Sequence, residues 1–77
     1  MSVEQLQFIA ESDSPLGQFA QQALEFRAMA DRGEISEEEM AELMVDLARS
    51  EALEEAADDL DTKTALVTAI FVVAQVV

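Results

Sequence analysis

The chain has 77 residues and a formal net charge of −13, and it contains neither cysteine nor histidine. Without cysteine there can be no disulfide, thiolate metal site or thiol nucleophile, and without histidine the most common general base is missing. The charge repels nucleic-acid phosphates and anionic membranes, but it attracts basic proteins.

A first helix is expected from Ser2, because Gln5 stands three residues later, as in a capping box. The apolar residues that follow share one face at helical spacing. They are Val3, Leu6, Ile9 and Ala10. The segment ESDSP, residues 11–15, should end this helix.

A second helix is expected over residues 15–30. Asp13 or Ser14 can cap it, and Pro15 suits the first turn, where the backbone N–H has no helical partner. Its apolar residues again follow helical spacing. Gly33 comes just after its end and can adopt the left-handed conformation that often terminates a helix.

The third helix should begin after Ser36, whose hydroxyl and the carboxylate of Glu39 are spaced for a capping box. Its buried stripe is predicted to be Met40, Leu43, Met44 and Leu47. At 100° per residue, the next apolar group falls on the opposite side. That group is Leu53, Ala56, Ala57 and Leu60. We therefore predict a break at Arg49-Ser50 and a fourth helix of about ten residues capped by Ser50; the alternative is one continuous helix with two partners.

The last helix should run from Lys63 to about Val76, with Asp61 or Thr62 as its cap. It is apolar on nearly every side, so we expect it to be buried all round. Its valines would also suit a strand, but a lone strand would have no pairing partner. Residues 65–77 are too few to cross a membrane, which takes ~20 apolar residues, so we expect no membrane role.

These elements predict an all-α fold: a single domain, residues 1–77, formed by a small bundle of four to five short helices. The apolar C-terminal helix should lie at the centre. Because so short a chain buries only a small core, we expect oligomerisation to complete the bundle. The predicted interface is formed by Leu66, Ile70, Phe71, Val73 and Val77.

The segment from Gly33 to Glu39 resembles the second half of an EF-hand calcium loop. With Gly33 at loop position 6, Ile35 occupies position 8 and Glu39 position 12. Positions 1, 3 and 5 would then be two alanines and an arginine, which cannot supply the remaining ligands. We therefore interpret the segment as a helical hairpin and predict no metal site.

The segment Asp13-Ser14-Pro15-Leu16 resembles the Asp-Ser-Leu motif of acyl carrier proteins, which are also small, acidic and helical. That resemblance would make Ser14 the attachment point of a prosthetic group. A proline interrupts the motif, however, and only one short helix precedes it. We interpret Ser14 as a helix cap and predict no cofactor.

Acidic residues are concentrated in the middle of the chain. Residues 31–61 hold thirteen of the seventeen acids and only two of the four basic residues. The predicted acidic face comprises Glu38, Glu42, Glu54, Glu55, Asp58 and Asp59. Carboxylates on solvated helix faces lack the cleft that acid–base catalysis requires, so we expect no enzyme activity and no catalytic residues.

The sequence thus predicts a non-catalytic protein that acts in protein–protein assembly, as a homo-oligomer or as an accessory subunit of a larger complex. The alternative is an acidic regulator, or nucleic-acid mimic, that binds a basic protein surface. In either case the partner has a basic or apolar surface and is not itself nucleic acid. The general character is similar to accessory proteins of bacterial viruses, although no single motif carries that similarity. The polar start of the chain shows no secretion signal, so we expect a cytoplasmic protein.

Overall fold

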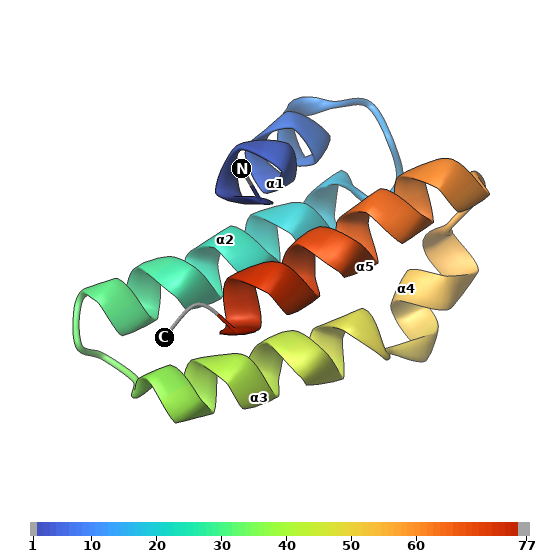
Figure 1. Cartoon of the computed structure of the whole chain (residues 1–77). Helices are drawn as coiled ribbons and strands as arrows, with labels where there is room; N and C mark the ends of the chain where they lie inside the picture. Colours follow the sequence, from blue (N-terminus) through green and yellow to red (C-terminus); the bar gives the residue numbers. More distant parts are fainter. Residues whose placement is uncertain (1, 76–77) are drawn as a thin grey trace.

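The structure, a computed structural model, describes residues 2–75, with the exception of the Ser2 side chain. These residues form only helices and connecting turns, which confirms the predicted all-α bundle (Figure 1). The helices are α1 (Ser2–Glu11), α2 (Gly17–Asp31), α3 (Glu37–Ala48), α4 (Glu51–Ala56) and α5 (Leu60–Gln75). The predicted capping role of Ser2 and the last residues of the C-terminal helix lie outside this description.

Helix α5 lies at the centre of the bundle and packs against α1, α2 and α3 (Figure 1). Every helix contributes a buried side chain to one core, for example Leu6 of α1, Phe19 of α2, Met44 of α3, Leu53 of α4 and Ile70 of α5. No polar or charged side chain of the described residues is buried. The bundle is therefore held together by apolar burial, with its charges left in water.

The turn between α2 and α3 contains both features that the sequence predicts: a glycine that ends α2 and a capping box that begins α3. Gly33 has a φ of 78°, and the N–H of Glu34 donates to the carbonyl of Met29 over 2.9 Å, as in a Schellman motif. Ser36 then accepts from the N–H of Glu39 at 3.0 Å, while the Glu39 carboxylate accepts from the N–H of Ser36 at 2.9 Å. This capping box fixes the direction in which α3 leaves the turn.

The predicted break after α3 is confirmed, and Ser50 caps α4 by accepting from the N–H of Leu53 at 3.2 Å. Helix α4 is nevertheless shorter than expected, with six residues instead of about ten. It ends because Ala57 adopts an extended conformation, with φ −73° and ψ 117°. Leu60 therefore belongs to α5 and is 73% exposed, contrary to its predicted place on the buried stripe of the fourth helix.

Helix α5 begins three residues earlier than predicted, because Asp59 caps it instead of Asp61 or Thr62. The carboxylate of Asp59 accepts from the N–H of Asp61 at 3.3 Å and from the hydroxyl of Thr62 at 2.7 Å. The backbone N–H of Asp61, an orphan donor of the first turn, is thereby satisfied, and the Thr62 hydroxyl adds a side-chain bond to the same carboxylate. Only three residues therefore connect α4 to α5, and two of them are aspartates.

The connection from α1 to α2 depends on a close approach at Gly17. A Cβ at this position would lie 3.3 Å from the carbonyl oxygen of Ile9 and 3.4 Å from those of Ala10 and Ser12. Because these are backbone atoms, a larger side chain would push the end of α1 away from α2. The second helix begins at Gly17, two residues later than predicted, and Leu16 at its N-cap position makes no side-chain capping bond. The predicted cap at Ser14 is therefore wrong: its hydroxyl accepts from the N–H of Leu16 at 3.1 Å within the turn that precedes the helix.

The burial of α5 predicts a contrast between two adjacent aliphatic positions. Ile70 is fully buried, whereas Val72 is 42% exposed. Ile70→Ala should lower the free energy of unfolding by about 2–5 kcal/mol, and Val72→Ala by less than about 1 kcal/mol. Urea unfolding followed by circular dichroism would measure both. If Ile70→Ala does not fold, Ile70→Val should still cost more than Val72→Ala, and equal losses would contradict the placement of α5.

Candidate protein-binding surface

Most of the residues predicted to join one chain to another lie inside the core of a single chain. Leu66 and Ile70 are fully buried and Val73 is 2% exposed, within a bundle made by the chain itself. Phe71 is half-buried, and Val77 is outside the described residues. The predicted interface therefore has little surface to offer a second chain, because its buried members already contact α1, α2 and α3.

The exposed side of α5 is only weakly apolar. Its exposed residues include the polar Thr64, Thr68 and Gln75. Only two large aliphatic residues are exposed between residues 60 and 75, Leu60 and Val72. A helix that is apolar all round in sequence is thus covered by its own bundle, with a row of threonines toward solvent.

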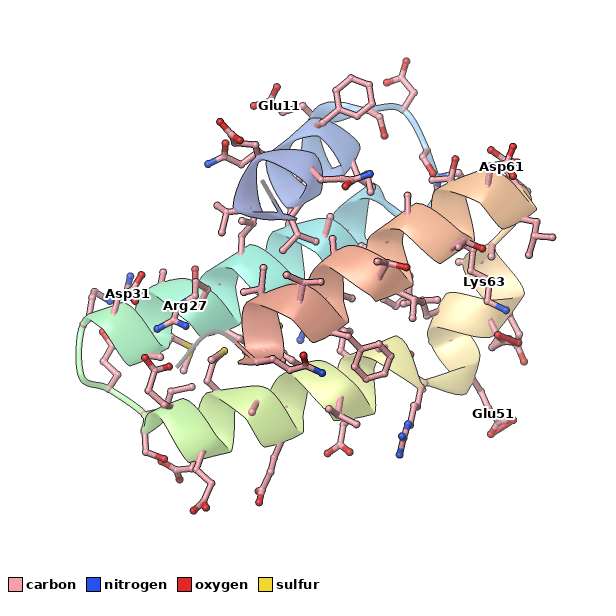
Figure 2. All side chains as sticks on the ribbon, in the orientation of Figure 1. Glu11, Arg27, Asp31, Glu51, Asp61 and Lys63 are labelled. Atoms are coloured by element: carbon pink, nitrogen blue, oxygen red, sulfur yellow. The ribbon has the colours of Figure 1, made fainter. Side chains whose placement is uncertain are left out.

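Three of the four basic residues form ion pairs. Arg27 of α2 joins Asp31 in its own helix and Glu37 in the first turn of α3, each at 2.8 Å. The hydrogen bond to Glu37 raises the pKa of Arg27 further, so this cation is permanent. Figure 2 shows Arg27 and Asp31 at the end of the molecule where α2 turns into α3, with Lys63 and Glu51 toward α4.

Arg32 and Lys63 are paired as well. Arg32 reaches Glu34 at 2.6 Å and Glu25 at 3.2 Å, and Lys63 of α5 pairs with Glu54 of α4. The remaining cation, Arg49 at the C-terminal end of α3, forms no ion pair with another described residue. Two of the four cations therefore offset half of the charge of the four carboxylates with which they pair at the α2–α3 turn. The outer side of α3 has no such pairs within residues 2–75.

The six residues of the predicted acidic face are all exposed: Glu38, Glu42, Glu54, Glu55, Asp58 and Asp59. Two of them are already engaged, since Glu54 pairs with Lys63 and Asp59 caps α5. The other four form no ion pair within residues 2–75 and are free to contact a partner.

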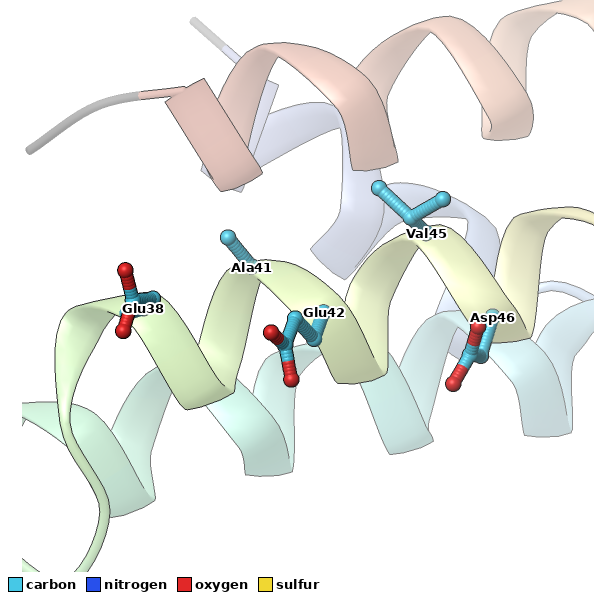
Figure 3. A pocket seen from close by; sticks show the side chains of 5 residues that line it. All are labelled: Glu38, Ala41, Glu42, Val45 and Asp46. Atoms are coloured by element: carbon cyan, nitrogen blue, oxygen red, sulfur yellow. The ribbon is translucent and has the colours of Figure 1, made fainter.

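Along α3 the free carboxylates form a regular row. Glu38, Glu42 and Asp46 are four residues apart, so they stand one above the other on the helix face turned away from the core. Beside them Ala41 and Val45 form the apolar floor of a shallow groove of about 480 Å³. Figure 3 shows the carboxylates on one side of α3 and the two apolar residues along its neighbouring edge. We call these five residues the α3 surface.

Sequence reasoning omitted Asp46 from the acidic face, although the four-residue spacing from Glu38 and Glu42 would have identified it. The groove itself was not predicted, because Ala41 and Val45 do not stand out in a helix with a strong buried stripe. An arrangement of spaced carboxylates around a narrow apolar floor suits long basic side chains, whose methylene stems cover carbon while their charges reach oxygen.

The residues that carry the two sequence resemblances form local hydrogen bonds in the turns that precede α2 and α3. Glu39 and Ser36 bond to each other, so neither is available to a cation at the α2–α3 turn. No group of three potential metal ligands occurs among residues 2–75. The hydroxyl of Ser14 accepts from the N–H of Leu16 in the turn before α2.

Comparison with protein-family models, with curated proteins and with solved structures found no match to this chain. None of the helices in the described part has the length and apolar character required to cross a lipid bilayer.

The cap of α5 makes a testable prediction about pH. Hydrogen bonds from Thr62 and from the backbone of Asp61 lower the pKa of Asp59 below its usual value. Because the folded-state pKa is depressed, the stabilisation is present above the unfolded pKa and is lost as pH falls through the folded one. Carboxyl NMR titration should show this low midpoint, and Thr62→Val should raise it. An unshifted midpoint in the parent protein would contradict the cap.

Proposed function

We propose that this protein is a non-catalytic interaction module that binds a basic protein surface through the α3 surface and the neighbouring carboxylates of α4. Glu51 and Glu55 of α4, and Asp58 just after it, are also exposed and add negative charge beyond Arg49 in the chain. The observation that carries the proposal is the separation of charge. The cations of the α2–α3 turn are paired, whereas Glu38, Glu42 and Asp46 of α3 are exposed and have no partner within the described residues.

The sequence favours a different function, assembly through the C-terminal helix. Ile70 and the buried residues around it stabilise the single chain, so using them between chains would require the bundle to open. The α3 surface needs no such rearrangement. Electrostatic complementarity of this kind accelerates encounter and selects partners by charge.

Self-association remains a second candidate, because several large apolar side chains are exposed: Val3, Phe8, Leu43, Leu60 and Val72. They are distributed over α1, α3 and α5. Two copies would also have to overcome the repulsion between −13 charges, whereas a basic partner is attracted by them. Charge therefore favours a partner of the opposite sign.

The proposal predicts that neutralising the α3 surface weakens binding to a fluorescent oligolysine peptide. The variant carries Glu38→Gln, Glu42→Gln and Asp46→Asn. Each exposed ion pair contributes ~0.2–1 kcal/mol, so the loss of three pairs should raise the dissociation constant by roughly three- to one-hundredfold at low salt. Binding of the parent protein should also weaken steeply as salt is added. Fluorescence anisotropy at several salt concentrations measures both effects.

A control variant removes the same charge from the neutralised end, by Glu25→Gln, Asp31→Asn and Glu34→Gln. These carboxylates already pair with Arg27 and Arg32, so the control should bind the peptide nearly as well as the parent protein. Equal weakening by both variants would mean that only net charge matters, and the α3 surface would lose its assigned role.

A further inference from the structure

A second crevice lies between the C-terminal part of α1 and the first turn of α5. It has a volume of about 290 Å³ and is lined by Gln5, Phe8, Ile9, Ser12, Ser14, Asp61, Thr62 and Ala65. Unlike the groove of the α3 surface, it is formed by segments far apart in the chain. Figure 2 places Asp61 at the end of the bundle where α5 begins. Gly17 and the Asp59 cap hold the two walls in position.

Phe8 is the unusual member of this crevice, because it is 75% exposed. It falls off the buried stripe of α1, whose members Leu6 and Ile9 are covered by α2 and α5. Its ring therefore contributes little to the core of this chain. An exposed aromatic side chain also lowers the solubility of a protein, so its position needs another explanation. An aromatic face that is left open beside a crevice is suited to contact with a ligand.

Some polar side chains of the crevice already form hydrogen bonds within the chain, and one carboxylate does not. Ser12 donates to the carbonyl of Ile9 at 2.7 Å, Ser14 accepts from the N–H of Leu16 at 3.1 Å, and Thr62 donates to Asp59 at 2.7 Å. The carboxylate of Asp61 forms no hydrogen bond or ion pair with a described residue. An open aromatic ring and a free carboxylate thus border the same small apolar floor of Ile9 and Ala65.

We propose that this crevice receives one arginine or lysine side chain of the basic partner, with its methylene stem on Ile9 and Ala65, its cation against Phe8 and its N–H groups donating to Asp61. A cation is attracted both by an aromatic face and by a carboxylate, and its stem covers carbon. Arginine satisfies all three contacts best, since its planar guanidinium can stack on the ring and still donate to an oxygen.

The inference rests on the proposed function, because it assumes a basic protein partner, but it names a different contact site. The crevice is lined by no residue of the α3 surface. One partner side chain held in a crevice would give directional recognition, which a row of exposed carboxylates cannot supply alone.

The test uses isotope-labelled protein and two blocked amino acids, N-acetyl-arginine amide and N-acetyl-citrulline amide, which have similar shapes but differ in charge. The arginine compound should shift the resonances of Gln5, Phe8 and Thr62 saturably, and the citrulline compound should shift them far less. Phe8→Ala should weaken arginine binding about two- to fivefold. Asp61→Asn should weaken it as well and reduce its salt dependence.

Matched controls exclude general effects. Leu60→Ala removes an equally exposed apolar side chain outside the crevice, and Asp13→Asn removes one charge from the loop after α1 without changing the lining. Both should leave arginine binding unchanged. Circular dichroism should show that each variant keeps its helices.

The inference is overturned if the arginine compound gives no saturable shift at the crevice, or if citrulline gives the same shift. In that case oligolysine binding at the α3 surface would still stand or fall by its own variants. Conversely, arginine binding at Phe8 together with an inert α3 surface would refute the proposed function and leave the crevice as a separate site.

Discussion

The burial of α5 by the other helices of the same chain is the constraint on which the rest of the structure depends. Leu66, Ile70 and Val73 give the bundle its centre, and α1, α2 and α3 pack around them. Since no charged side chain of residues 2–75 is buried, this apolar contact is not offset by ion desolvation. The carboxylates are consequently left at the surface, where they can be used for recognition.

Ion pairing then decides which part of that surface stays charged. Arg27 and Arg32 both act at the α2–α3 turn. Arg27 joins α2 to α3, and Arg32 pairs with acids of α2 and of the turn itself. No equivalent pairing occurs along the outer face of α3 within the described residues. The row from Glu38 to Asp46 is thus negative because no cation of the described residues forms an ion pair with it. A basic partner would reduce the repulsion that these carboxylates exert on one another.

Local signals in the sequence identified the elements that depend on short-range chemistry. The capping box of Ser36 and Glu39, the left-handed Gly33 and the cap at Ser50 each involve residues within a few positions, so their pattern can be read directly. The start of α5 was placed incorrectly because Asp59, Asp61 and Thr62 are all competent caps. Because α4 already ends at Ala56, the first of these three candidates, Asp59, is free to cap α5. The sequence alone does not reveal this early end.

What the sequence could not predict were the tertiary partners. An all-round apolar helix must be buried, but its composition does not say whether its own chain or a second chain covers it. The most direct measurement is amide hydrogen exchange in residues 65–75 as a function of protein concentration. If the chain buries α5 by itself, slow exchange should persist unchanged on dilution into the monomeric range. Protection that disappears on dilution would show that other copies cover this helix, and would contradict the account.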